Sequence, residues 1–515
     1  MAALVNTFAI AGIEGYRVEA ETTLLDGQPV LSIIGLGDQA VKESGDRIQA
    51  ALDACGYDFP KKKVIINLAP GDRKKSGSHF DLAMALGVLV QSGSVSPGKM
   101  SEFGFIGELS LNGELRPCAG ILPMVMAAKK CGIRKIVLPV ENEDEAKLVR
   151  DVEVYGLSSM TQVLDLLEGR MISCRDMHVR YSGTDEAKAD SLTDFADVRG
   201  QDDLIDAVVL AAAGGHNLLM IGTPGCGKTM VAQRIPSIMP EMTDEERLEV
   251  TKIHSIAGMV EKDHSLITER PFRAPHHNAS LNALVGGGVN AMPGEVSLAH
   301  NGVLFLDELT EYSRHTLDAL RQPIEDKKVT ISRVNGTNTY PANFMLVAAM
   351  NPCPCGYYPD RKCRCTDYEI IKYRGRISGP VMDRIDIQKE VHAVGYFDME
   401  GKSRSRTSAE LREQVCKARE IQHARYLSLP GIYCNAQMTN SLIQTYCRLD
   451  GETTRLLKNT CDRYGCSART IHKLLKLART NADLNASENI RYEDVETAIR
   501  CRDLDRSNGE MMVVK

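Results

Sequence analysis

The sequence predicts a multidomain α/β protein with a small N-terminal α+β domain, a central α/β domain on a parallel sheet, and a helical C-terminal domain. Three observations predict this class. Strand and helix patterns alternate through residues 1–170, fully apolar runs typical of parallel strands recur within 194–395, and helical periodicity dominates 396–515. The polar stretch 171–193 has no apolar period, so we expect a linker there.

Composition narrows the class of protein. The 515 residues carry a net charge of −6, which excludes a uniformly basic nucleic-acid coat, and the lack of Trp disfavours a base-stacking platform. No apolar run is long enough to span a membrane, and the N-terminus lacks the basic start of a signal peptide. Most of the 15 cysteines are scattered singly, as in a reducing compartment. We therefore expect a cytoplasmic protein without a membrane partner.

The N-terminal domain is predicted from alternating elements. Its strand and helix patterns support a mixed sheet covered by helices. Strand patterns occupy residues 16–25, 30–36, 64–68, 103–109 and 135–139, and helical patterns occupy 41–52 and 79–89.

The central domain is organised around a glycine-rich segment that follows the apolar run 217–221. Glycines permit the tight turn whose backbone N–H groups surround a triphosphate, and the following helix adds its positive N-terminal end. The segment predicts ATP binding, with Lys228 at the β and γ phosphates and Thr229 on Mg²⁺. It fits G-x-x-x-x-G-K-T, the Walker A motif, in Gly222, Thr223, Pro224, Gly225, Cys226, Gly227, Lys228 and Thr229.

Two further buried strands are predicted to end at the same nucleotide. The run 302–306 ends in Asp307 and Glu308, a Walker B pattern. Asp307 is predicted to hold Mg²⁺ through water, and Glu308 to polarise the attacking water. The run 344–349 delivers Asn351, which at a strand end would orient water near the γ-phosphate.

A cysteine cluster follows directly within 353–365. Four converging thiolates are the ligand set of a structural Zn²⁺ site. The C-x-C spacing is tighter than the common C-x₂-C, so free thiols and an iron–sulfur cluster remain alternatives. The cluster consists of two C-x-C pairs, Cys353 with Cys355 and Cys363 with Cys365.

The interval between Thr229 and Asp307 is longer than one strand-helix-strand step, which predicts an insert at about 250–300. Adjacent His276 and His277 lie in it. Neighbouring side chains diverge on a strand or a helix, so we expect a structural or pore-facing segment rather than a metal site.

Alternating β-branched residues over 329–337 lead into Asn335-Gly336. This combination predicts a β-hairpin between the Walker B segment and the strand that carries Asn351.

The central and C-terminal motifs resemble the magnesium-chelatase-like AAA+ ATPases, in particular their YifB/ComM branch. The resemblance rests on residues 270–280, 286–288 and 373–386, and extends from about 195 to 479. It implies a homo-oligomeric ring, for which six subunits are expected.

The same resemblance assigns roles to individual residues. It implies that Arg384 is a finger reaching the nucleotide of the neighbouring subunit, and that Arg469 is the sensor 2 arginine of a C-terminal lid. It also implies that the hairpin faces the pore, with Arg333 and Asn335 against threaded DNA.

Residues 74–86 and 107–139 resemble the proteolytic domain of Lon, which implies a ribosomal-protein-S5-type fold. Lon-type proteolysis needs a serine nucleophile with a lysine base. Here Gly77 stands at the serine position, with serines on either side, and Leu122 and Met124 stand at the lysine positions. A leucine cannot accept a proton, so we expect a non-proteolytic domain that is either structural or recruits a protein partner.

The sequence thus predicts an ATP-hydrolysing ring motor with ATP, Mg²⁺ and structural Zn²⁺ as cofactors. The resemblance implies action on DNA as a helicase or branch-migration translocase, in recombination or natural transformation. One alternative is a protein-remodelling or metal-chelatase-type chaperone, which the fused Lon-like domain disfavours. The other is an ATP-dependent protease, which Leu122 and Met124 disfavour.

Overall fold

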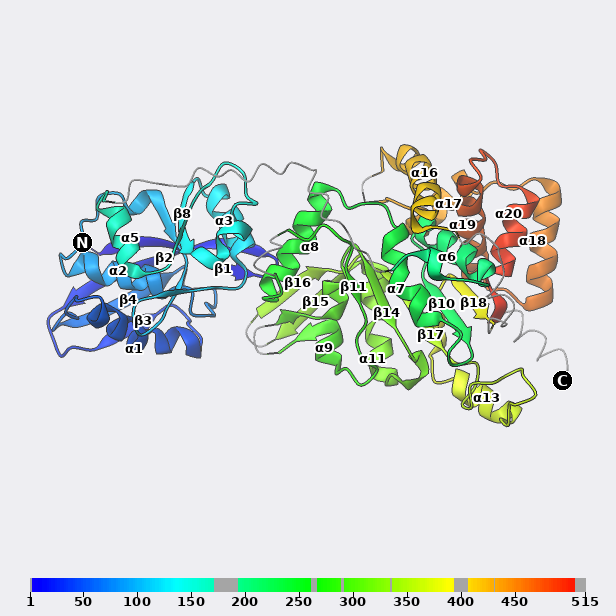
Figure 1. Ribbon diagram of the computed structural model, residues 1–515, viewed down its shortest axis with the longest axis horizontal. Coiled ribbons are helices and arrows are strands. Elements are labelled where there is room, and N and C mark those ends of the chain that lie inside the picture. The colour runs from blue at the N-terminus through cyan, green and yellow to red at the C-terminus, as the bar shows by residue number, and fades with distance from the viewer. Residues whose placement is uncertain are drawn as a thin grey trace.

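The computed structural model places an N-terminal body, a central body and a C-terminal helical body in a row along the longest axis of the molecule (Figure 1). Of the predicted linker 171–193, only residue 193 belongs to the described part. No described helix combines the length and apolar character needed to cross a bilayer. The structure describes residues 2–170, 193–260, 266–288, 291–333, 336–392, 406–429 and 431–504.

The N-terminal body is built on a seven-stranded mixed sheet of order β3-β4-β2-β1-β5-β8-β9. The β1–β2 and β2–β4 pairs are antiparallel, and the other neighbours are parallel. A short hairpin of β6 (Glu108–Leu109) and β7 (Leu115–Arg116) stands apart from it. The strands are β1 (Ala3–Ala11), β2 (Glu14–Leu25), β3 (Leu31–Ile34), β4 (Lys63–Ala69), β5 (Phe103–Phe105), β8 (Lys135–Pro139) and β9 (Glu153–Leu157).

Helices cover both faces of this sheet because successive side chains of a strand point to opposite sides. On β1, Val5 and Ala9 enter one core, whereas Phe8 enters the other. The first core contains α1 (Gln39–Ala54), α2 (Asp81–Gln91) and α5 (Met160–Leu167), and the second contains α3 (Ile121–Lys130) and α4 (Glu143–Ala146).

The central body has a five-stranded sheet of order β11-β14-β17-β10-β18 in which every pair is parallel. Both faces are buried, so its strands are continuous apolar runs. Leu218 and Met220 face one core, and Leu219 and Ile221 face the other. The strands are β10 (Leu218–Gly222), β11 (Phe272–Arg273), β14 (Val303–Leu306), β17 (Met345–Met350) and β18 (Ile387–Val391).

The helices of the central body precede the first strand of its sheet or lie between successive strands along the chain. Two short strands, β12 (Gly286–Gly287) and β13 (Met292–Pro293), pair within the predicted insert. The helices are α6 (Asp202–Gly214), α7 (Lys228–Ile238), α8 (Asp244–Ile256), α9 (Leu281–Val285), α10 (Glu295–Leu298), α11 (Arg314–Ala319), α12 (Arg321–Asp326), α13 (Asp367–Arg374) and α14 (Gly379–Met382).

The predicted hairpin is confirmed: β15 (Lys328–Arg333) pairs antiparallel with β16 (Gly336–Pro341). Arg333 ends β15, and Asn335 lies outside the described residues. The hairpin sits beside the N-terminal body (Figure 1), and a Cβ built on Gly12 would lie 3.4 Å from the carbonyl oxygen of Thr339.

The C-terminal body is helical, as the periodicity predicts. Its first helix, α16, packs against α6 and α7, and α19 packs against α6 and α20. The helices are α16 (Ser408–Tyr426), α17 (Asn440–Tyr446), α18 (Gly451–Tyr464), α19 (Ala468–Leu484) and α20 (Tyr492–Arg500).

Several elements differ from the sequence expectation. The apolar N-terminus forms β1, the centre of the first sheet, which was not predicted. The single strand expected over 103–109 is divided between β5 and β6. Part of the predicted insert is β11, an edge strand of the main sheet.

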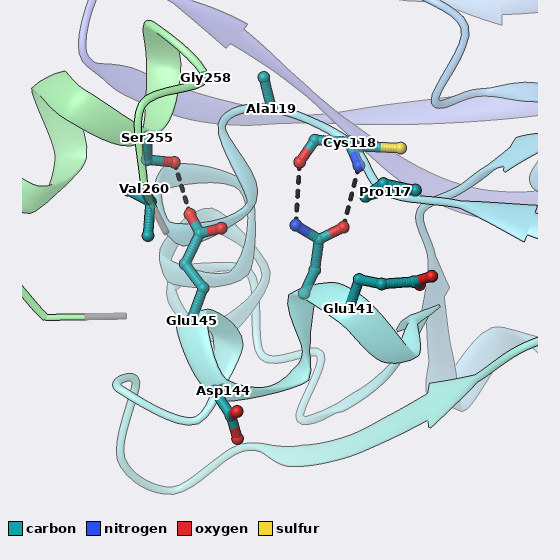
Figure 2. A pocket seen from close by; sticks show the side chains of 10 residues that line it. Pro117, Cys118, Ala119, Glu141, Asp144, Glu145, Ser255, Gly258 and Val260 are labelled. Atoms are coloured by element: carbon teal, nitrogen blue, oxygen red, sulfur yellow. Dashed lines mark hydrogen bonds between the residues drawn. The ribbon is translucent and has the colours of Figure 1, made fainter. Parts of the chain in front are cut away.

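The N-terminal and central bodies meet where α3 packs against α8. The Ser255 carbonyl accepts a hydrogen bond of 2.9 Å from the backbone N–H of Gly120, and the Ser255 hydroxyl donates to the Glu145 carboxylate. Figure 2 shows Ser255 hydrogen-bonded to Glu145 in the wall of a pocket that Cys118 and Glu141 also line. The volume of this pocket is about 240 Å³. Burial raises the pKa of Glu145, and the Ser255 and Leu122 hydrogen bonds partly offset it.

Candidate nucleotide site

The Walker A segment forms the turn between β10 and α7. Gly225 and Gly227 have φ of 79° and 90°, which residues with a Cβ rarely adopt, so the glycines are required by the backbone. The Lys228 ammonium donates to the carbonyl oxygens of Gly222 at 2.7 Å and Thr223 at 3.0 Å. The lysine charge is therefore held within the loop that is predicted to bind phosphate.

The carboxyl ends of β10, β17 and β14 lie side by side because these strands are parallel neighbours. The Thr229 hydroxyl donates to Asp307 Oδ2 at 2.9 Å, so the two predicted Mg²⁺ ligands are in contact. The other oxygen of Asp307 accepts from the Glu308 backbone N–H at 2.9 Å. Asn351 follows the last residue of β17 at this same edge, half-buried.

These residues suit Mg²⁺ with a triphosphate. A hydroxyl and a carboxylate supply the oxygen ligands that Mg²⁺ prefers, and the ammonium supplies a charge for the phosphates. The structure thus brings together Lys228, Thr229, Asp307, Glu308 and Asn351 from three strands.

A contact that the sequence did not predict involves the histidine pair. His277 Nδ1 lies 3.1 Å from Glu308 Oε2. The carboxyl ends of β10, β14 and β17, where the predicted nucleotide-binding residues lie, are called the nucleotide edge below. Strand β11 runs parallel to β14, so the chain that follows β11 also leaves the sheet at this edge. The Tyr312 hydroxyl donates to the Pro275 carbonyl at 2.6 Å and fixes this turn, and burial together with Asp307 raises the Tyr312 pKa.

The sequence predicted that the histidine turn is a structural or pore-facing insert, and it did not predict that His277 lies beside Glu308. The position of the turn is set by β11, and a strand of two residues is too short to give a recognisable pattern in the sequence. The centroids of the two imidazole rings lie 4.1 Å apart. Within the turn, His276 Nδ1 accepts a hydrogen bond of 3.2 Å from the backbone N–H of Asn278.

The four cysteines of the C-x-C pairs converge, with their Sγ atoms all within 4.8 Å of one another. They follow Asn351 and β17 directly, so residues 353–365, the cysteine loop, begin at the nucleotide edge of the sheet. The protruding loop and α13 lie below the central body in Figure 1.

Arg384, the predicted finger, and Arg469, the predicted sensor 2 arginine, lie close together. Arg384 Nη2 forms an ion pair of 2.5 Å with Glu325, and its Nη1 donates to the Pro380 carbonyl. Arg469 Nη1 lies 3.4 Å from Asp383, the residue before Arg384.

Both arginines are far from the Walker A segment of their own chain. Arg384 precedes β18, and its carbonyl accepts from Asn217, the residue before β10. The five residues of β10 separate that end from the phosphate loop, a distance of about 16 Å. Arg384 and Arg469 thus lie near the amino ends of the strands, opposite the carboxyl ends that carry the predicted nucleotide residues.

At the positions where the proteolytic lysines are predicted to be missing, the side chains are apolar and buried. Leu122 and Met124 are fully buried in α3, and Gly77 has φ of 98° in the turn before α2. Neither buried side chain can take up a proton.

Family models for magnesium chelatase match most of the chain. The description "Magnesium chelatase, subunit ChlI" matches residues 194–399, "Subunit ChlI of Mg-chelatase" matches 18–142, and "Magnesium chelatase, subunit ChlI C-terminal" matches 405–502.

Similar proteins span the same length. Competence protein ComM of Haemophilus influenzae is 39% identical over 490 residues, which cover 95% of each chain. The YifB protein of Escherichia coli is 40% identical over 510 residues, 98% of this chain and 97% of that protein. The Lon protease of Porphyromonas gingivalis is 29% identical over 204 residues, 36% of this chain and 24% of the protease. The family models and the near full-length identity agree with the nucleotide site described above, and the chain accordingly belongs to the YifB/ComM group of magnesium-chelatase-like AAA+ ATPases.

Proposed function

We propose that this chain is the subunit of an ATP-driven ring that moves along DNA as a helicase or branch-migration translocase. The observation that carries the proposal is the position of the β15–β16 hairpin. It connects α11 and α12, the helices after the Walker B strand β14, to β17, the strand that leads to Asn351. A polymer bound at the hairpin is thereby linked to the nucleotide edge through β17. The name of the Haemophilus influenzae relative, a competence protein, supports DNA as that polymer.

In this proposal, ATP hydrolysis uses the residues at the nucleotide edge. Lys228 turns from the carbonyls of Gly222 and Thr223 to the β and γ phosphates. Thr229 and Asp307 would hold Mg²⁺, and the ion would supply positive charge that compensates the phosphate oxygens. Glu308 accepts the proton of the attacking water, and Asn351 orients that water.

The opposite edge of the sheet completes the site of the next subunit. Arg384 and Arg469 cannot reach the phosphate loop of their own chain, so both act in trans in a homo-oligomer, for which we propose six subunits. Arg384 leaves its ion pair with Glu325 when it reaches the neighbouring γ-phosphate.

The cysteine loop, in this proposal, holds a structural Zn²⁺. Four sulfur atoms within 4.8 Å of one another match tetrahedral thiolate coordination and leave no position for a substrate. The cysteines within the described residues are all free, which supports a reducing, cytoplasmic setting.

The N-terminal body, for which we propose the S5-type fold, acts as a recruiting module without proteolysis. It adjoins the hairpin at Gly12 and Thr339 and contacts α8 through Glu145 and Ser255. A protein partner bound there would touch both the motor and its proposed DNA-facing element.

The test of the proposed function is ATPase activity of the purified full-length chain with and without single-stranded DNA, duplex DNA and a three-strand junction. We expect DNA to stimulate turnover and DNA affinity to fall steeply with salt. In the Arg333→Ala variant, stimulation should decrease while the rate without DNA stays unchanged. Turnover that no DNA stimulates, with no DNA binding at low salt, would reject the proposal.

A metal-chelatase-type chaperone is the second candidate, because all three family descriptions name the chelatase subunit. The description that matches 18–142 removes the argument that the N-terminal domain sets this chain apart from that subunit. ATPase activity that responds to a protein partner but not to DNA would favour this candidate.

A further inference from the structure

From the contact between the cysteine loop and the phosphate loop we infer that a metal-bound cysteine loop supports the Walker A turn, so that Zn²⁺ binding and nucleotide binding strengthen each other. This inference rests on the zinc site and the nucleotide site of the proposed function. It adds a coupling between them that neither site requires by itself.

The first support is a close approach between the two loops. A Cβ built on Gly356 would lie 2.8 Å from Cδ and 3.0 Å from Cγ of Pro224, the third residue of the Walker A motif. Gly356 also has φ of +83°, so the turn between Cys355 and Cys363 can press against the proline ring only with glycine there.

The second support is the anchoring of the cysteine loop at the nucleotide edge. Cys353 is fully buried and lies two residues after Asn351. Its sulfur accepts a hydrogen bond of 3.4 Å from the Tyr358 N–H. The loop therefore begins beside the predicted water-orienting residue and turns back onto Pro224.

The third support is a guanidinium whose two terminal nitrogens are buried without acceptors among the described residues. Arg374 Nε donates to the Pro352 carbonyl at 3.2 Å, and the guanidinium carbon lies 5.5 Å from the centroid of the Tyr358 ring. Its Nη1 and Nη2 are buried and find no hydrogen-bond partner among the described residues. Buried guanidinium nitrogens without acceptors are costly, whereas Zn²⁺ with four thiolates would be an anionic cluster near Arg374, whose charge interacts with Cys353.

The metal thus has a mechanical consequence for the phosphate loop. Zn²⁺ closes the loop at four points and fixes Gly356 against Pro224. Without the metal the loop gains conformational freedom, and nucleotide binding must then order both loops, which weakens it. By linkage, nucleotide must tighten Zn²⁺ binding by the same factor.

The first experiment measures the dissociation constant of a fluorescent ATP analogue for the full-length chain, with zinc content determined on the same samples. Removing the metal by chelation, or by Cys363→Ser with Cys365→Ser, should weaken binding by about tenfold, within the usual range for coupled sites. Cys131→Ser, at an exposed cysteine of the N-terminal body, should change neither quantity.

The second experiment needs no cysteine variant. The rate of zinc release to a chromophoric chelator is measured on the wild-type chain with and without a slowly hydrolysed ATP analogue, and the analogue should slow release. Pro224→Ala, which removes the ring that touches Gly356, should keep the zinc but lose most of this effect.

The outcomes distinguish failure of the zinc site from failure of its coupling to nucleotide binding. Protein that contains no zinc and cannot be loaded with it rejects the metal site, and the coupling with it. Protein that contains zinc but binds the analogue equally well after removal rejects the coupling alone. If the analogue fails to bind the zinc-loaded chain, the proposed nucleotide site is wrong.

Discussion

At the scale of single residues, Lys228 and Glu308 serve different steps and should fail differently. Lys228→Ala removes the charge held in the phosphate loop, so nucleotide binding should be lost. Glu308→Gln keeps the Asp307–Thr229 contact and removes only the base, so ATP should stay bound while turnover falls by roughly 10²- to 10⁴-fold. Nucleotide binding and single-turnover hydrolysis measure the two steps. Glu311→Gln, three residues further on and paired with Arg376, is the control that should stay active.

His277 is expected to be a positioning residue for Glu308. Its ring nitrogen lies 3.1 Å from the carboxylate, and the His277 side chain is half-buried whereas that of Glu308 is exposed. Loss of one such contact near the surface is worth up to about 1 kcal/mol, so His277→Ala should lower kcat by up to roughly fivefold and leave KM for ATP unchanged. His277→Asn should restore part of the rate because an amide can also donate.

The neighbouring histidine provides the comparison. His276 bonds within its own turn, so His276→Ala should reduce kcat less than His277→Ala. Equal kcat for wild type and His277→Ala would show that the contact does not orient the base.

At the scale of elements, the cysteine loop is expected to be a separate metal-stabilised unit. Purified protein should contain about one Zn²⁺ per chain, and Cys353→Ser with Cys363→Ser should release it. Elemental analysis measures the content. The same double change at Cys461 and Cys466, which lie together at the end of α18, should leave the zinc in place. Fully folded, active protein without bound metal would contradict a structural zinc.

At the scale of the whole molecule, the proposed function has Arg384 of one subunit complete the ATP site of the next, because the sheet keeps Arg384 away from the phosphate loop of its own chain. Arg384→Ala chains, inactive alone, should regain turnover when mixed with Lys228→Ala chains, because each supplies what the other lacks. A cation acting in trans is worth on the order of 10³ to 10⁵ in rate, so partial recovery should be easy to detect. Steady-state ATPase assays over a series of mixing ratios measure it.

The mixing experiment has a matched control in Arg314→Ala, an exposed arginine paired with Asp318, which should be active without mixing. Mixed rings that recover no activity would point to a different arginine, such as Arg374, Arg376 or Arg469.

The sequence by itself determined the elements of the nucleotide site. The Walker A glycines, the carboxylates after 302–306 and the cysteine pairs are local patterns whose backbone or ligand requirements can be read directly. Buried strands β10, β14 and β17 were predicted because both faces of a parallel sheet are covered, which leaves continuous apolar runs. Strand β1 was missed, since an apolar N-terminus gives no indication that it lies in the centre of a sheet.

Only the tertiary structure decided which of these elements touch. Strand order brings His277 to Glu308 and Gly356 to Pro224, and it sends Arg384 to the edge opposite its own phosphate loop. Ser255 meets Glu145 in the same way, across two bodies of the chain. These contacts join residues distant in sequence, and they depend on how strands pair and helices pack, which no local periodicity encodes.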